Sequence, residues 1–253
     1  MPGPGGPALP PLFSLVAHDV LGSTSDEAKR LAAEGAPHGT LVWAREQTGG
    51  RGRLDRSWVS PRGNLFMSVV LRPEVAPAQA AELGFAAALA VADAVSAYLP
   101  ADAPVELKWP NDVLVAGAKI AGILLEARSG TGGLVDWVVL GIGINIAAAP
   151  SGTPYPAACL GAFSPAPAVE PVLERLGGAL AQHLATWEGR GFPPIRDAWL
   201  AKARGLGERL EIRHGGAAVS GRFLDLDMDG ALVLETATGV RRITAGDVYF
   251  SPS

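Results

Sequence analysis

The chain has 253 residues, of which 48% are hydrophobic, and a formal net charge of -4. This length fits one large domain, or a main domain with a smaller one, and allows a sizeable buried core. The acidic balance argues against non-specific nucleic-acid binding, the single cysteine excludes an internal disulfide, and the four scattered histidines argue against a structural zinc site.

The N-terminal part predicts a tail, a helix and two strands. Residues 1–11 are rich in Gly and Pro and lack a basic stretch followed by an apolar one, so we expect a disordered tail and not a signal peptide. The segment 23–35 predicts a helix, because hydroxyl side chains can cap its start and two acids occupy its first turn. Strands are expected over 41–44 and 65–71, with an Arg- and Gly-rich loop between them.

The middle of the chain predicts one helix and four strands. An alanine-rich run over 79–99 indicates a buried helix, whose apolar part, 85–99, is too short to span a bilayer and contains Asp93. We therefore expect a cytoplasmic protein that does not contact membranes. The strands that follow are expected over 105–108, 113–115, 118–127 and 134–145.

The amino-acid composition changes in the C-terminal part of the chain. A loop is expected over 147–168, a helix over 169–188 and a shorter helix after Pro194. From about Arg204 onward, short β-like runs alternate with turn residues, which indicates a small barrel and a domain boundary. These runs cover 209–213, 218–226, 231–235 and 240–244.

The Arg- and Gly-rich loop is the first segment that carries chemistry. It reads Gly49-Gly50-Arg51-Gly52-Arg53. Glycine lets the backbone approach a ligand closely, and arginine presents a charged fork that matches carboxylates and phosphates. The loop suits an anionic ligand, but a solvated surface turn has the same composition, so the companion segments have to decide between the two.

A second segment reads Lys108-Trp109-Pro110-Asn111-Asp112. The proline excludes a helix and predicts a turn at a strand end, where Asn111 can bind a nucleotide or the backbone. Asp112 can hold magnesium or anchor an arginine, and an Asx-turn is the plain alternative. Lys119 starts an apolar strand, so it must be paired, bind a ligand or cap the strand edge, because burying an unpaired ammonium is costly. Gly122 then leaves room for a ligand or a helix.

A third segment, Gly141-Ile142-Gly143-Ile144-Asn145, ends a buried strand in alternating glycines. It predicts either close helix packing or a flat floor beneath a ligand, with Asn145 at the polar end of that ligand. Taken together with the Ser-Thr-Ser helix start, the three segments resemble the catalytic core of biotin protein ligases. The resemblance covers about residues 12–250, with the motifs in the same order and at similar spacings.

The resemblance implies an α+β fold. It implies a mixed sheet flanked by helices over 12–203, like the catalytic core of class II aminoacyl-tRNA synthetases, and an SH3-like barrel over 204–253. Larger members of the family carry an N-terminal helix-turn-helix. Only about eleven residues precede Leu12, so we expect that domain, and binding to DNA, to be absent here.

The resemblance also implies site residues. Contacts with biotin are expected from Ser23, Thr24, Ser25, Gln47, Arg51, Gly52, Arg53, Lys119 and Gly122. Contacts with ATP are expected from Arg53, Trp58, Asn111, Lys119 and Asn145. The catalytic cations would be Lys119, Arg51 and Arg53, and Asp112 would position Mg²⁺. After Arg53 the loop reads Leu54-Asp55-Arg56, where the family often continues with Arg-Gly-Arg; we expect the inner arginines to keep the chemistry.

The implied activity is ATP-dependent. Biotin and ATP would form biotinyl-5′-AMP with the help of Mg²⁺, and biotin would then pass to a lysine of a biotin carboxyl carrier protein domain. Two alternatives stay open, a lipoate-type acyl-adenylate ligase and a non-catalytic regulator that binds biotin or nucleic acid. The sequence does not decide between a monomer and a homodimer.

Overall fold

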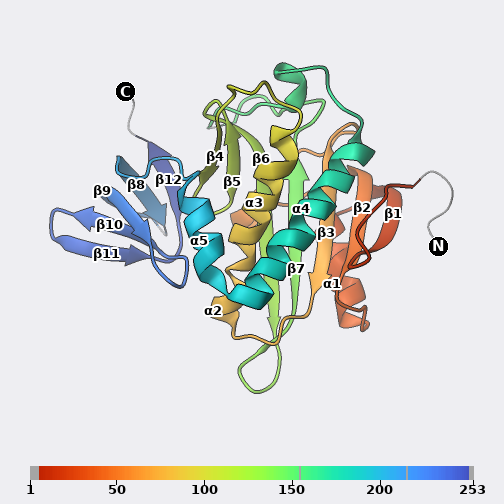
Figure 1. Ribbon diagram of the computed structural model, residues 1–253, viewed down its shortest axis with the longest axis horizontal. Helices are drawn as coiled ribbons and strands as arrows, with labels where there is room; N and C mark the ends of the chain where they lie inside the picture. Colours follow the sequence, from red (N-terminus) through yellow and green to blue (C-terminus); the bar gives the residue numbers. More distant parts are fainter. Residues whose placement is uncertain (1–5, 154, 215, 251–253) are drawn as a thin grey trace.

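The computed structural model describes residues 6–153, 155–214 and 216–250. A mixed seven-stranded sheet with helices on both faces is followed by a smaller antiparallel sheet (Figure 1). The strands of the large sheet are β1 (Ser14–Leu21), β2 (Thr40–Gln47), β3 (Leu65–Leu71), β4 (Val105–Lys108), β5 (Asp112–Val115), β6 (Ala118–Ser129) and β7 (Val135–Ile144). The α+β class expected from the sequence is confirmed.

The order of the strands brings distant motifs together. The large sheet runs β1-β2-β3-β7-β6-β5-β4, with β1 parallel to β2 and the other neighbouring pairs antiparallel. In this order β7 lies between β3 and β6, so Gly143 pairs with Phe66 on one side and with Gly122 on the other. The two glycines expected to leave room for a ligand are therefore direct neighbours.

Helices cover the sheet on two sides. Alternate residues of β2, β3 and β7 face opposite ways, and two separate apolar clusters result. One cluster joins the sheet to α3 (Leu83–Ser96) and α4 (Val169–Arg190). The other joins Val42, Val70 and Val139 to Ala28 and Ala32 of α1 (Thr24–Ala33). The helices are α1 (Thr24–Ala33), α2 (Pro77–Ala80), α3 (Leu83–Ser96), α4 (Val169–Arg190) and α5 (Phe192–Leu200), with short 3₁₀ turns at Arg53–Asp55 and Leu160–Ala162.

The helix α3 belongs to the core. By length and composition alone, the stretch 77–96 is apolar enough to cross a membrane, but 72% of it is buried inside the structure. Its alanines let it lie close to β6 and α4 (Figure 1). The burial explains the apolar composition without a membrane.

The C-terminal sheet is antiparallel and five-stranded, in the order β11-β10-β9-β8-β12. It contacts the large sheet at the second motif, where the indole of the buried Trp109 donates to the carbonyl of Gly230 at 3.1 Å. Within the described residues no strand pairing joins β11 to β12, so the sheet is described as open and not as a closed barrel. Its strands are β8 (Arg209–His214), β9 (Ala217–Leu226), β10 (Leu232–Thr236), β11 (Gly239–Ile243) and β12 (Asp247–Phe250).

Several elements differ from the sequence prediction. The strands β1 and β12 were not predicted, and the helix expected over 79–99 is divided into α2 and α3. The helix α5 begins at Phe192 and not after Pro194, because proline is tolerated in the first turn of a helix. Of the two residues expected in the turn of the second motif, Asn111 lies there, but Asp112 is already the first residue of β5.

The described part of the predicted tail is packed. Pro7 is buried, and the amide of Ala8 donates to Glu174 of α4 at 2.8 Å. A Cβ on Gly177 of α4 would lie 2.8 Å from Leu9, so this segment lies directly against the helix. The expectation of disorder for residues 1–11 is therefore wrong for 7–11, while residues 1–5 lie outside the described part.

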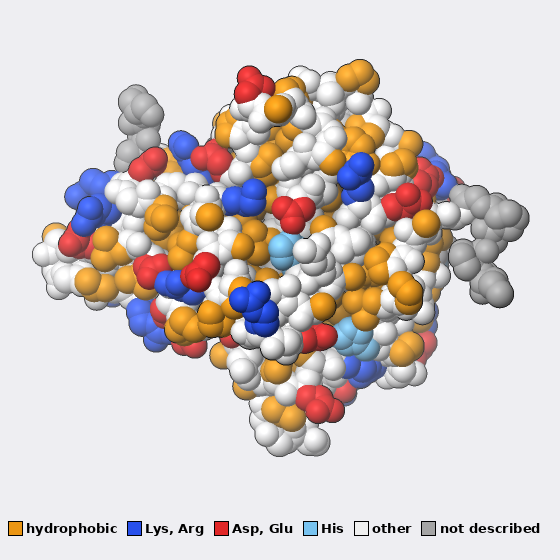
Figure 2. Space-filling model, viewed as in Figure 1, with side chains coloured by type: hydrophobic (Ala, Val, Ile, Leu, Met, Phe, Trp, Pro, Cys, Tyr) orange, Lys and Arg blue, Asp and Glu red, His pale blue; other side chains and the backbone are white. Residues whose placement is uncertain are grey.

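The surface carries charges of both signs close together (Figure 2). On the C-terminal sheet, Arg222 pairs with Glu235 at 3.0 Å and Arg213 with Glu211 at 2.5 Å. Exposed pairs of this kind add little stability, but they leave each cation with a neighbouring carboxylate.

Candidate active site

A cavity of about 530 Å³ opens above β3, β6 and β7 and beneath the Arg- and Gly-rich loop. Its wall contains every site residue that the sequence suggested, from segments separated by more than a hundred positions. These residues are Ser23, Thr24, Ser25, Gln47, Arg51, Gly52, Arg53, Trp58, Asn111, Asp112, Lys119, Gly122 and Asn145. The structure brings them together, while their individual roles stay predictions.

One end of the cavity is lined with hydroxyl groups at the start of α1. Ser23 is the N-cap, and its Oγ accepts from the amide of Asp26 at 3.4 Å. Thr24 and Ser25 both reach the buried Ser68 of β3, at 2.9 and 3.1 Å. Gln47 uses both ends of its amide within the protein, since Oε1 accepts from Thr24 and Nε2 donates to Ser60. This end suits a neutral polar ligand group.

The Arg- and Gly-rich loop folds back on itself. The amide of Trp58 donates to the carbonyl of Gly50, and the amide of Gly52 donates to Arg56. A Cβ on Gly50 would lie 2.5 Å from the carbonyl oxygen of Trp58, so glycine is required there. Leu54 takes a left-handed conformation with φ 55°, which is unusual for a residue other than glycine.

The glycine floor is covered by an aromatic ring. A Cβ on Gly143 would lie 2.6 Å from Nε1 of Trp58, and one on Gly122 would lie 2.9 Å from the same ring. At Gly122 and Gly143 an indole ring therefore takes the place expected for a ligand or a helix, whereas at Gly141 the helix α1 does pack closely, since a Cβ there would lie 2.7 Å from Ser25 Oγ. Trp58 lies on the glycines, with Lys119 Nζ 5.2 Å from its ring.

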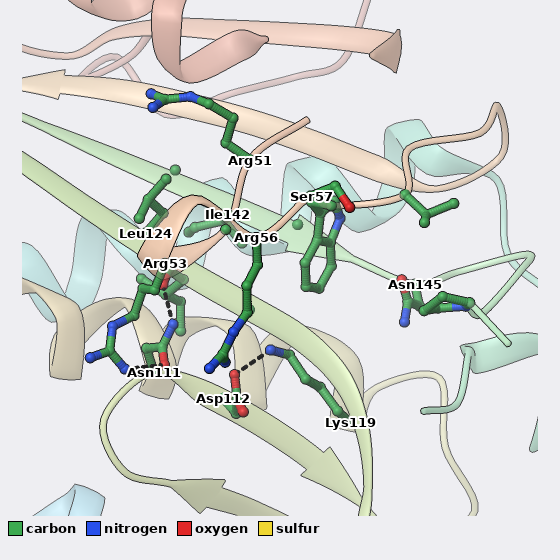
Figure 3. Close-up of a pocket in the computed structure, with 18 of the residues that line it drawn as sticks. Arg51, Arg53, Arg56, Ser57, Asn111, Asp112, Lys119, Leu124, Ile142 and Asn145 are labelled. Atoms are coloured by element: carbon green, nitrogen blue, oxygen red, sulfur yellow. Dashed lines mark hydrogen bonds and ion pairs between the residues drawn. The ribbon is translucent and has the colours of Figure 1, made fainter. Parts of the chain in front are cut away.

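Cations gather at the other end of the cavity. Lys119 Nζ lies 2.5 Å from Oδ1 of Asp112 (Figure 3). Lys108 Nζ lies 3.9 Å from Oδ2 of the same carboxylate. Lys108 is 6% exposed, and burial lowers the pKa of its ammonium group. Its Nζ also lies 4.1 Å from the ring of Tyr155. This end is built to receive negative charge.

The loop arginines point in different directions. Arg53 turns toward Asn111 and donates to its Oδ1 at 3.3 Å, whereas Arg51 points away from Lys119 and Asp112 (Figure 3). Arg51 is ion-paired with Asp26 at 2.8 Å and with Glu126 at 3.0 Å. Of the two inner arginines, only Arg53 lies at the cationic end.

Asn111 and Asn145 differ in what they leave free. Both ends of the Asn111 amide already bond within the protein, because Nδ2 donates to Ile123 and Oδ1 accepts from Arg53. Asn145 is 2% exposed and donates to Ala158, but its Oδ1 has no hydrogen-bond partner among the described residues. A buried acceptor without a partner is costly, so a ligand donor would satisfy it.

Known families match both parts of the chain. Residues 18–145 match the model of the biotin/lipoate A/B protein ligase family, and residues 205–251 match that of the biotin protein ligase C-terminal domain. A biotin–[acetyl-CoA-carboxylase] ligase of Paracoccus denitrificans is 44% identical over 90% of this chain and 97% of its own length. The chain belongs to the biotin protein ligase family.

Other relatives of the ligase agree with this. The bifunctional ligase/repressor BirA of Bacillus subtilis is 37% identical over 92% of the chain and 73% of its own length. A biotin protein ligase from Aquifex aeolicus, solved in complex with biotin and ATP, superposes with a TM-score of 0.79 at 26% identity and covers 95% of this chain and 99% of its own. A ligase from Leishmania major, solved with biotinyl-5-AMP, has a TM-score of 0.64 at 27% identity, covering 93% and 100% of the two chains.

The ligase also has lining residues that the sequence reasoning missed. Arg56 pairs with Asp247 of β12, and the hydrogen bond that it donates to this carboxylate raises the pKa of the Arg56 guanidinium group. Lys108 belongs to the second motif, so the sequence could have indicated it as a lining residue. Asp247 comes from the C-terminal sheet, and no local pattern marks it. Ser68 lies behind the wall, hidden in an apolar strand.

The surroundings of Asp112 do not fit a magnesium ligand set. Mg²⁺ prefers several oxygen ligands, whereas the nearest charged neighbours of Asp112 in the ligase are Lys108 and Lys119. Within the described residues, no group of three or more His, Cys, Asp or Glu side chains is arranged to hold a metal ion. In this arrangement the Asp112 carboxylate is the counter-ion of two ammonium groups.

Proposed function

We propose that the protein activates biotin with ATP and transfers it to a lysine of a biotin carboxyl carrier protein domain. The observation that carries this proposal is a cavity with hydroxyl groups at one end and cations at the other. Biotin has a neutral ureido ring and a carboxylate tail, so it matches both ends. Family membership supports the same assignment.

The first step joins two anions. A carboxylate oxygen of biotin attacks the α-phosphorus of ATP, the new O–P bond forms, and the bond to pyrophosphate breaks. Lys119, Lys108 and Arg53 are the side chains we assign to offset the repulsion. Hydrogen bonds to charged groups contribute about 1.5–3 kcal/mol each, so two or three account for several orders of magnitude in rate. Magnesium enters this scheme with the phosphates of ATP, as part of the substrate.

The second step releases AMP. The neutral amine of the carrier lysine attacks the biotinyl carbonyl, an amide bond forms, the bond to AMP breaks, and the amine gives up a proton. Asn145 and Trp58 are proposed to bind adenine, because one offers a free buried acceptor and the other an aromatic face. We assign the protein to the cytoplasm, where carrier domains would meet it.

The test combines the protein with biotin, ATP, Mg²⁺ and an apo carrier domain, followed by mass measurement of the carrier. We expect the mass of the carrier to rise by one biotinyl group, and only when ATP is present. A parallel reaction with lipoate in place of biotin tests the alternative. Modification with lipoate and not with biotin, or no modification, would overturn the proposal.

A further inference from the structure

We infer that Ser68 is a positioning residue that fixes the hydroxyl of Ser25 as a hydrogen-bond acceptor toward the ligand. This inference rests on the proposed function and extends it to the recognition of the ureido ring. Ser68 is fully buried in β3 and does not line the cavity itself. It acts through Ser25, which does line the cavity.

The direction of the hydrogen bonds that end at Ser25 is set first at Gln47. Its Oε1 accepts from the backbone amide of Thr24 at 2.8 Å, and its Nε2 donates to Ser60 at 2.9 Å. The Ser60 hydroxyl can accept there because its own hydrogen goes to the carbonyl of Trp58 at 2.8 Å. Both ends therefore fix the same orientation of the Gln47 amide.

The donor and acceptor in each of the following hydroxyl contacts are then determined in turn. Thr24 Oγ1 lies 3.1 Å from Gln47 Oε1, which can only accept, so the Thr24 hydroxyl donates there. A hydroxyl has one hydrogen, and Thr24 must then accept from Ser68, 2.9 Å away. The hydrogen of Ser68 is now used, so the contact with Ser25 at 3.1 Å has Ser25 as the donor.

The result is a defined ligand preference. The Ser25 hydroxyl has given its hydrogen to Ser68 and keeps only lone pairs for the cavity, which complement a ureido N–H. Ser23 is different, because its Oγ already accepts from the Asp26 amide and its hydrogen stays available to a ligand acceptor. A donor next to an acceptor matches the carbonyl and N–H of a ureido ring.

The glycine opposite Ser25 supports this arrangement. A Cβ on Gly141 would lie 2.7 Å from Ser25 Oγ and 3.4 Å from Ser68 Oγ. The missing side chain gives the two hydroxyls the room to face each other. Ser68 also interrupts the otherwise apolar strand Leu65–Leu71, and a buried hydroxyl is tolerated only where it is hydrogen-bonded.

The experiment measures biotin affinity by calorimetry for the parent, Ser68→Ala, Ser25→Ala and the double variant. We expect each single change to weaken biotin binding roughly five- to tenfold. Because Ser68 acts through Ser25, the double variant should bind biotin within about twofold of Ser25→Ala alone. Ser96→Ala, which removes a serine hydrogen bond to the carbonyl of Ala92 far from the cavity, is the matched control.

A second measurement separates positioning from general damage. In two cyclic carbamate analogues of biotin, a ring oxygen replaces one or the other ureido N–H. The parent should reject at least one analogue strongly, and Ser68→Ala should reduce that rejection about tenfold or more, since Ser25 is then free to turn and donate. Additive effects in the double variant, or unchanged rejection in Ser68→Ala, would overturn the inference alone. A parent that binds no biotin would overturn the proposed function with it.

Discussion

Arg51 and Glu126 form an ion pair beside the cavity, with Nη2 of Arg51 3.0 Å from Oε2 of Glu126. Asp26 of α1 holds the same guanidinium at 2.8 Å. In this state the arginine that the sequence marks as catalytic is turned away from Lys119 (Figure 3). It must leave two carboxylates before it can contact an anionic ligand.

Weakening the ion pair between Arg51 and Glu126 should therefore make it easier for Arg51 to contact an anionic ligand. In Glu126→Gln, we expect the KM for biotin in adenylate formation to fall by up to about fivefold, because partly exposed pairs contribute about 0–1 kcal/mol. The measurement is pyrophosphate release at varied biotin concentration. Glu235→Gln, which removes the partner of Arg222 on the C-terminal sheet, is the control. An unchanged KM would mean that Arg51 has a purely structural role.

Lys119→Ala should nearly abolish adenylate formation. The Lys119 ammonium lies at the cationic end beside Asp112, where negative charge would develop on the phosphoryl oxygens. Loss of one such group costs on the order of 100-fold or more in rate. The readout is pyrophosphate release, with Lys202→Ala, outside the cavity wall, as the control. Normal release by Lys119→Ala would refute the assignment.

Arg53→Ala should make the adenylate escape. Arg53 donates hydrogen bonds to Asn111 and to the carbonyl of Gly246. Its replacement by alanine therefore removes both contacts that it makes between the loop and these segments. We expect biotinyl-5′-AMP to appear free in solution while carrier modification falls. Rapid filtration of the enzyme after a single turnover measures the retained fraction. Retention equal to that of the parent would contradict the role of Arg53 in holding the adenylate.

Gly143→Ala should weaken the binding of ATP, whereas Gly178→Ala should stabilise the fold. A Cβ at Gly143 displaces Trp58, so the KM for ATP should rise about tenfold, because stacking of a base on an aromatic contributes about 1–3 kcal/mol. At Gly178 of α4 nothing lies within 4 Å, and alanine should raise the free energy of unfolding by about 1 kcal/mol. A rise in the KM for biotin alone in Gly143→Ala would place Trp58 at the biotin end.

The pH dependence of stability should respond to Glu82. This carboxyl is 7% exposed and accepts from the indole of Trp187, and burial raises its pKa. The folded state then keeps a proton that the unfolded state loses above about pH 4.3, so this stabilisation is full below that pH and is lost as the pH rises through the raised pKa. Glu82→Gln should gain stability relative to the parent across that window. Parallel denaturation midpoints for the two proteins from about pH 4 to 8 would contradict this.

Much of the fold could be read from the sequence because its signals are local. The apolar run of β3 and the strand β4 were predicted over the same residues that the structure has. The strand β1 escaped because polar residues such as His18 and Asp19 interrupt its apolar positions; its pairing with β2 holds it in place. The strand β12 is only four residues long.

The members of the site could be predicted, but their arrangement could not. Resemblance to a family gave the residue names, and the order of the strands then brought them to one cavity. The direction of Arg51 depends on Glu126, 75 positions away, and the polarity of Ser25 depends on Ser68, 43 positions away. Such pairings are decided by the fold, and no spacing in the sequence encodes them.

The wall of the cavity begins at Ser23 and is completed by Asp247. A ribosome has to release nearly the whole polypeptide before Arg56 can meet its carboxylate. Unfinished or clipped translation products therefore lack the clasp that would retain a reactive mixed anhydride. Any adenylate that such a fragment still formed would therefore escape into solution and acylate other amines.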